Sequence, residues 1–176
     1  TVECHTARLW SGKILLLAAT ALCLRRRTPA AAGSTCVAAG PETAQPYVFP
    51  FFPDPVGYQA AVDVRYVSGS WGRSGVTCWL RQRCQLLLGE EPTPLQRTLV
   101  AADAGHGVAV PVDPKSYTFV NADLSVHLAR SLRGDWVGLE SQSVAGTSGI
   151  GLCQTRLWDA DGPVGHGLQS LIIARR

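Results

Sequence analysis

The second half of the chain alternates between apolar and polar residues in the manner of antiparallel strands. From residue 120 to residue 128, every second residue is apolar and those between are polar, which is the two-residue period of a strand with one buried face. Apolar-rich segments follow at residues 136–144, 150–158 and 164–174, and Asp159-Ala160-Asp161-Gly162 fits a hairpin turn between the last two. We therefore expect four antiparallel strands after residue 119.

One helix is predicted ahead of these strands. Thr93 fits its N-cap, Pro94 its first helical position and Gln96 the partner of a capping box. Leu95, Leu99, Ala102 and His106 then recur at helical spacing, with Asp103 at the edge of this apolar stripe. A carboxylate on a buried helix face costs free energy, so it marks either a structural hydrogen bond or a reaction centre.

Two shorter strands are expected before the helix. They cover residues 61–67 and residues 76–86, and on the second of them Cys78, Leu80, Cys84 and Leu86 line one face. A single helix lying across a curved antiparallel sheet buries all of these faces economically. The pattern thus predicts an α+β domain over residues 56–176.

The N-terminal part reads as a separate piece. Residues 1–24 form a hairpin around Trp10-Ser11-Gly12-Lys13, and residues 28–55 hold six of the eleven prolines and no regular period, as a linker does. We expect an incomplete unit at 1–27, a Pro/Ala/Gly-rich linker at 28–55 and a domain at 56–176. Because the chain has no Met and opens as if within a strand, we expect that a preceding segment is missing from the sequence.

Composition excludes several classes of function. Apolar residues make up 46% of the chain and charged residues 16%, which predicts a real core, while a net charge of +3 without a basic aromatic face argues against nucleic acid. The apolar run from Ile14 is 11 residues long, and a transmembrane helix needs roughly 20. The six cysteines include no C-x-x-C pair, so we expect reduced thiols, no metal site and a cytoplasmic protein.

Several short segments together resemble a known family. They are Trp71-Gly72-Arg73, Ala101-Ala102-Asp103, residues 119–127, Gly134-Asp135-Trp136 and residues 162–169. Their order and spacing resemble the second hotdog of tandem-hotdog acyl-CoA thioesterases of the thioesterase II (TesB) type, in the branch common in actinobacteria. The resemblance implies a hotdog fold, a curved antiparallel sheet wrapped on one long helix, and makes residues 1–27 the closing strands of a preceding hotdog.

The resemblance also implies a reaction and its residues. In that family an Asp, a Thr or Ser and a Gln hold the water that attacks the thioester; by position these are Asp103, Asn121 and Gln169, with Asn121 departing from the hydroxyl. Gly105, through backbone N–H groups near it, and Ser125 are the expected substrate-binding positions. The implied activity is hydrolysis of fatty acyl-CoA without metal or cofactor, by a homo-oligomer that is a dimer of double hotdogs.

Other interpretations of these residues stay open. Asp103 could cap local backbone N–H groups, and Asp123 or Ser125 could act in place of Asn121, whose face they share. A non-catalytic acyl-CoA-binding or degenerate homologue would explain Asn121. A hotdog enoyl-CoA hydratase would require an Asp and a His a few residues apart, as Asp103 and His106 are.

Overall fold

The computed structural model describes residues 2–25, 39–49 and 56–176 of the chain. These residues fall into two compact units, Thr1–Ser34 and Thr35–Arg176. The expected linker at 28–55 lies partly outside the described residues, but its described part contains a short strand, β3 (Gln45–Tyr47), which pairs with residues 64–66 within the second unit.

The first unit is the hairpin that the sequence predicts. Strand β1 (Val2–Ser11) pairs antiparallel with β2 (Ile14–Leu24), and the turn between them contains Gly12 at a φ of 58°, a left-handed conformation that suits glycine. Every described residue of both strands is exposed.

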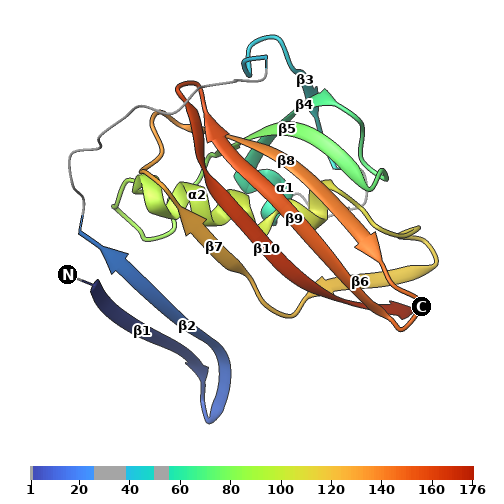
Figure 1. Ribbon diagram of the computed structural model, residues 1–176, viewed down its shortest axis with the longest axis horizontal. Helices are drawn as coiled ribbons and strands as arrows, with labels where there is room; N and C mark the ends of the chain where they lie inside the picture. The colour runs from blue at the N-terminus through green and yellow to red at the C-terminus, as the bar shows by residue number, and fades with distance from the viewer. Residues whose placement is uncertain (1, 26–38, 50–55) are drawn as a thin grey trace. The chain divides into compact units, whose positions relative to one another are not determined.

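In its described residues, the second unit is an eight-stranded antiparallel sheet with three helices (Figure 1). The strands run in the order β3-β4-β5-β8-β9-β10-β6, and β7 pairs with residues 165–168 of β10, ahead of the residues that pair with β6. Their bounds are β4 (Val62–Ser68), β5 (Gly75–Gln82), β6 (Tyr117–Asn121), β7 (Ser125–Leu128), β8 (Trp136–Ala145), β9 (Ile150–Asp159) and β10 (Gly162–Arg175). The helices are α1 (Tyr58–Ala61), α2 (Pro94–Asp103) and α3 (Gly105–Val108).

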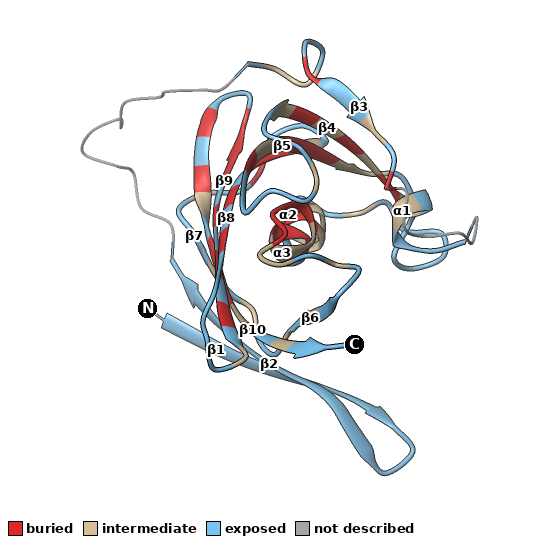
Figure 2. Cartoon of the chain, turned by 90° about the vertical axis from the view of Figure 1, so that its right-hand side faces the viewer, coloured by how far each residue is buried: buried red, intermediate tan, exposed pale blue. Residues whose placement is uncertain are grey.

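The curled sheet wraps around α2 and α3, as Figure 2 shows, and this confirms the predicted α+β arrangement. The N-terminus of α2 carries the predicted capping box between Thr93 and Gln96. Toward the sheet the helix presents small side chains, Thr98, Ala101 and Ala102, each at most 1% exposed. These small residues let the helix approach the core residues of the strands closely.

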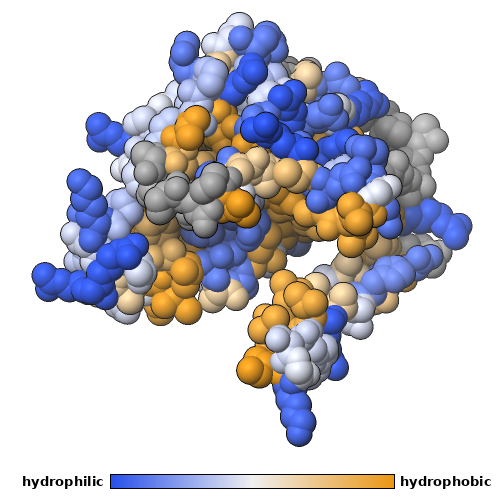
Figure 3. All heavy atoms as spheres, turned by 180° about the vertical axis from the view of Figure 1, so that it is seen from behind, coloured by the Kyte–Doolittle hydropathy of each residue, from blue (hydrophilic) through white to orange (hydrophobic). Residues whose placement is uncertain are grey.

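The predicted apolar stripe of α2 is confirmed for Ala102 but wrong for Leu95 and Leu99, which point outward. Leu95 and Leu99 are 55% and 40% exposed, and Asp103, one further turn along, is exposed as well. The reason is steric: the narrow space inside the sheet takes the small face of the helix, so the larger leucines point outward. Figure 3 shows hydrophobic surface lying between polar groups on this side of the protein.

Three further expectations about the elements need correction. The helix is not one long element, because α2 ends at Asp103 and Ala104 leads into α3. The strand expected at 76–86 ends at Gln82, so Cys84 and Leu86 lie beyond it and are exposed. The strand expected at 120–128 is interrupted between β6 and β7, which makes five strands after the helices instead of four.

Candidate active site

Asp103 and Asn121 come together at the C-terminal end of α2. Asn121 is the last residue of β6 and stands opposite Leu171 of β10, a core residue, so its side chain points to the inner face of the sheet. There its Nδ2 donates a hydrogen bond of 2.9 Å to Oδ1 of Asp103. The other carboxylate oxygen, Oδ2, has no hydrogen-bond partner among the described residues. The pair therefore leaves an anionic acceptor open on an exposed residue.

Gln169 of β10 lies beneath this pair and is 2% exposed. Its Nε2 is 3.1 Å from the carbonyl oxygen of Asp103 and 3.2 Å from Nδ1 of His106, and its Oε1 accepts from the His106 backbone N–H at 3.2 Å. The amide thus holds the α2–α3 junction against the sheet. It contacts the backbone of Asp103 and not the carboxylate, which the sequence could not indicate.

His106 is the second residue of α3 and its ring packs between Gln169 and Phe119. The ring centroids of His106 and Phe119 are 6.1 Å apart with an interplanar angle of 87°, an edge-to-face contact. Burial lowers the pKa of His106, although the negative charge of Asp103 and the hydrogen bond to Gln169 act in the opposite direction. The imidazole is therefore neutral at neutral pH. Its Nδ1 contacts Gln169, and among the described residues no hydrogen bond joins the ring to the Asp103 carboxylate.

Gly105 has a packing role in this site. A Cβ at this position would clash with the Thr155 hydroxyl and would lie 3.1 Å from Oε1 of Gln169. Thr155 is buried and its hydroxyl is 2.9 Å from that of Ser141, so β8 and β9 place a polar pair directly under the helix junction. The alternation of buried and exposed side chains along β9 places Thr155 on the buried face. No sequence pattern predicts its contact with Gly105.

Ser125 and Asp123 lie away from Asp103. Ser125 stands opposite Leu168 of β10, whose side chain points to the other face of the sheet from Gln169. Asp123 accepts a hydrogen bond of 2.7 Å from the backbone N–H of Ser170, which bridges the interruption between β6 and β7. These geometries favour Asn121 over both alternatives as the partner of Asp103.

Tyr58 is a neighbour of the site that the sequence did not indicate. Its hydroxyl donates to the carbonyl oxygen of Val100, one turn before Asp103, at 3.1 Å. Burial, and then the charge of Asp103, raise the pKa of Tyr58, so its hydroxyl stays protonated. In the described part of the chain, no three His, Cys, Asp or Glu residues gather as metal ligands would.

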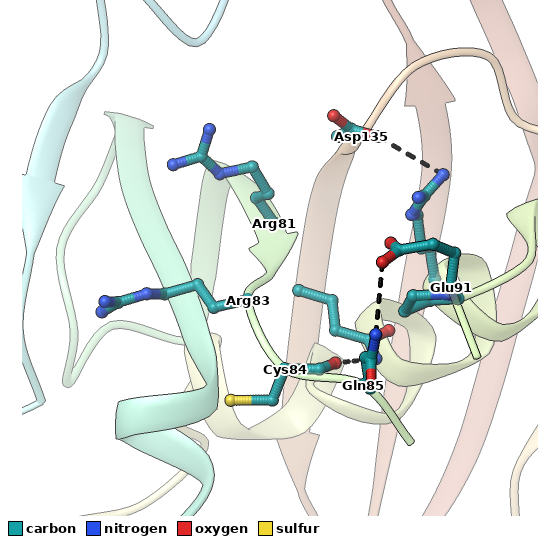
Figure 4. A pocket seen from close by; sticks show the side chains of 9 residues that line it. Arg81, Arg83, Cys84, Gln85, Glu91 and Asp135 are labelled. Atoms are coloured by element: carbon teal, nitrogen blue, oxygen red, sulfur yellow. Dashed lines mark hydrogen bonds and ion pairs between the residues drawn. The ribbon is translucent and has the colours of Figure 1, made fainter. Parts of the chain in front are cut away.

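A polar pocket of about 290 Å³ lies elsewhere, near the N-terminal end of α2 (Figure 4). Its arginines are paired with acids: Arg97 with Asp135 at 3.3 Å, and Arg81 with Asp63 at 2.6 Å. The pocket lacks a nucleophile with an adjacent base, so it does not compete with the Asp103 region as a reaction centre.

Comparison with solved structures defines the class of fold. A thioesterase II protein of Thermobifida fusca YX superposes with a TM-score of 0.72 at 18% identity, over 99% of this chain and 68% of that one. The acyl-CoA thioesterase II TesB2 of Mycobacterium marinum gives 0.64 at 16%, over 99% and 73%. A protein of unknown function with a hotdog fold from Alicyclobacillus acidocaldarius gives 0.65 at 12%, over 99% and 67%. The described domain is therefore a hotdog fold.

The family follows from the sequence comparison. Residues 23–173 match the family described as "Acyl-CoA thioesterase C-terminal domain", and the chain belongs to this family. It is thus a thioester hydrolase of the acyl-CoA thioesterase type, and the predicted resemblance to TesB-like thioesterases is confirmed. No curated protein matches the chain. Within the described residues, no helix is both long and apolar enough to cross a bilayer.

Proposed function

We propose that this protein hydrolyses fatty acyl-CoA to the free acid and CoA, with a water activated by Asp103. The observation that supports this most directly is the hydrogen bond from Asn121 Nδ2 to Asp103 Oδ1, because it fixes the carboxylate and leaves Oδ2 free to accept from a water. Family membership supports the acyl-CoA substrate, and the fatty acyl group is part of the proposal.

The reaction needs three contributions. A water must be positioned, its proton must be accepted, and donors must meet the negative charge that develops on the carbonyl oxygen. In our proposal Asp103 accepts the proton as the water oxygen attacks the carbonyl carbon. Asn121, which has both a donor and an acceptor, orients Asp103 and can accept from the same water. The tetrahedral intermediate then expels the CoA thiolate.

Hydrolysis of a fatty acyl-CoA, followed through release of the free thiol, tests this function. We expect turnover by the unaltered protein and a fall in kcat on the order of 100-fold or more for Asp103→Asn, which keeps the shape but removes the anionic acceptor. Asn121→Ala should lower kcat more than it changes KM, because Asn121 positions the nucleophile.

Asp123→Asn is the matched control, because Asp123 is also an exposed carboxylate near β6 but serves the backbone of β10. It should keep normal turnover. A folded Asp103→Asn protein with near-normal kcat would rule out the catalytic assignment. Binding without hydrolysis by the unaltered protein would instead favour the degenerate acyl-CoA-binding alternative.

Two further parts of the proposal concern the setting of the enzyme. We propose a cytoplasmic location, supported by the free thiols of all five described cysteines. We also propose that the working form is a dimer of double hotdogs, to which the exposed hairpin of residues 2–24 contributes.

A further inference from the structure

The loop between β5 and α2 exposes three consecutive leucines. Leu86 and Leu87 are each 53% exposed, and Leu88 is fully exposed. The sequence pattern places Leu86 in a strand, but β5 ends at Gln82 and the loop carries all three side chains into the solvent. Single exposed apolar residues are ordinary on a protein surface, whereas an exposed apolar cluster marks a site of interaction.

Hydrogen bonds at the base of the loop hold this tip in place. Oε1 of Gln85 accepts from the backbone N–H of Gly89 at 2.9 Å, and Nε2 of Gln85 donates to Oε1 of Glu91 at 3.2 Å (Figure 4). The backbone N–H of Glu90 donates to the carbonyl oxygen of Leu87 at 3.1 Å. Gly89 completes the turn at a φ of 82°, which favours glycine. The leucines are therefore presented by a defined turn.

The composition of the loop suits a lipid surface better than a protein partner. Protein interfaces take most of their binding energy from Trp, Tyr and Arg anchors that fill shaped pockets, and Leu is under-represented among such residues. Residues 83–92 contain no aromatic residue. A lipid surface demands no matching shape, and it accepts apolar side chains that enter the boundary between headgroups and acyl chains.

The charges beside the leucines suit a zwitterionic headgroup. The Arg83 side chain is 57% exposed and its Nε is 3.8 Å from Oδ1 of Asp63, which Arg81 already binds at 2.6 Å. In Figure 4 Arg83 extends away from the hydrogen bond between Gln85 and Glu91. Glu90, on the other arm of the loop, is exposed. A phosphatidylcholine headgroup offers a phosphate to the arginine and a quaternary ammonium to the glutamate.

We propose that Leu86, Leu87 and Leu88 insert into a zwitterionic phospholipid surface and so bring the enzyme to membrane-held substrate. The choice of lipid rests on the proposed hydrolysis of fatty acyl-CoA, because every CH₂ group of an acyl chain favours lipid over water and such a substrate gathers at bilayers. The loop leads into the N-terminal end of α2, whereas Asp103 is at the C-terminal end. The lipid contact is therefore separate from the candidate active site.

Vesicle flotation of the 176-residue chain measures this contact. We expect the unaltered protein to float with phosphatidylcholine vesicles. Leu88→Ser should lower the partition coefficient about tenfold or more, and Leu87→Ser combined with it about 100-fold, because each withdraws one leucine from the lipid. Leu152→Ser is the matched control, because Leu152 is 56% exposed but lies on the outer face of β9. It should float like the unaltered protein.

Two further measurements locate and characterise the contact. In hydrogen exchange, addition of vesicles should raise the protection of residues 86–90 and leave that of β9 unchanged. Residues 83–92 hold one Arg and two Glu, so binding should neither require phosphatidylserine nor weaken in salt. Binding that depends on phosphatidylserine and is lost in salt would overturn insertion through the leucines.

The remaining outcomes separate this inference from the proposed function. Equal flotation of the unaltered protein and the double variant would overturn the lipid contact. A change in sedimentation of Leu88→Ser without vesicles would also overturn it, because the leucines would then contact a second copy.

Hydrolysis of acyl-CoA in solution is measured without vesicles, and Leu88→Ser should keep its kcat. Hydrolysis without flotation would overturn the lipid contact and retain the hydrolase. Flotation through the loop without hydrolysis would retain the contact and count against the proposed function.

Discussion

At the scale of single residues, the site depends on how closely α3 approaches β9. Gly105 makes this approach possible, because any Cβ there would overlap the Thr155 hydroxyl beneath it. Around Gly107, two residues further on, no atom from outside its own turn of helix lies within 4 Å of the equivalent Cβ position. The two glycines therefore form a natural pair for comparison.

We predict that Gly105→Ala displaces α3 from the sheet and weakens the Gln169 clamp. Overpacking of this kind costs about 1–3 kcal/mol of stability, and kcat should fall because Asp103 moves with the helix junction. Gly107→Ala should keep both stability and kcat, since alanine suits a helix better than glycine. Urea unfolding and thiol release on both variants check this. Equal behaviour of the two variants would show that the contact with Thr155 does not control the site.

The sequence indicates part of the candidate site, and the rest depends on contacts between segments that are distant in the chain. The resemblance placed Asp103, Asn121 and Gln169, and the structure brings Asp103 to hydrogen-bonding distance of Asn121 and, through its backbone, of Gln169. Ser125 stands opposite Leu168 because the interruption after Asn121 shifts β7 by one residue relative to β6 along β10. The orientation of Gln169 depends on a backbone N–H sixty-three positions away in the chain, which local patterns do not encode.

At the scale of elements, the β9–β10 hairpin is stabilised by a buried carboxylate. Asp159 is 0% exposed and accepts from Arg130 through both oxygens at 2.6 Å, and from the backbone N–H groups of Arg133 and Asp161 at 2.8 Å. Burial alone would raise the pKa of Asp159, but the hydrogen bonds from these groups outweigh it and lower the pKa below its ordinary 3.8.

We predict that Asp159→Asn destabilises the fold by about 3 kcal/mol near neutral pH, because it leaves the Arg130 charge without its partner. Since the folded-state pKa is depressed, the contribution of Asp159 is complete above 3.8 and is lost as pH falls through the lower folded value. The difference between the two proteins should therefore shrink in acid. Asp161→Asn, which breaks the exposed pair with Arg133, should cost less than about 1 kcal/mol. Urea titrations on both sides of pH 3.8 measure this, and a difference that grows in acid would contradict the assignment.

Helices and strands could be predicted where apolar residues recurred with a single period along the sequence. The capping box and turn residues fixed the start of α2 and the β9–β10 hairpin. The facing of α2 was not predictable, because hydrophobicity alone assigns Leu95 and Leu99 to a core, whereas the space inside the sheet admits only Thr98, Ala101 and Ala102. The space that the sheet leaves for side chains is set by the tertiary structure, and it decided which face of α2 is buried.

At the scale of the whole molecule, the first unit cannot be stable through its own contacts. An isolated two-stranded hairpin is at best marginally stable in water, and every described residue of β1 and β2 is exposed. One of its faces brings Val2 next to Leu24 and Cys4 next to Leu22, with Val2, Leu22 and Leu24 between 60% and 73% exposed. Apolar surface of this extent promotes association.

We therefore predict that the 176-residue chain self-associates through residues 2–24. In hydrogen exchange, protection of β1 and β2 should rise with protein concentration, while protection of β8–β10 should stay constant, because those strands are held within the second unit. Replacement of both Leu22 and Leu24 by Lys should abolish this dependence and shift sedimentation toward the monomer. Thr20→Lys is the control, because it adds charge to the same face of β2 without removing apolar surface. A monomer at all concentrations, with β1 and β2 protected throughout, would show that the hairpin is stabilised within one chain and does not mediate assembly.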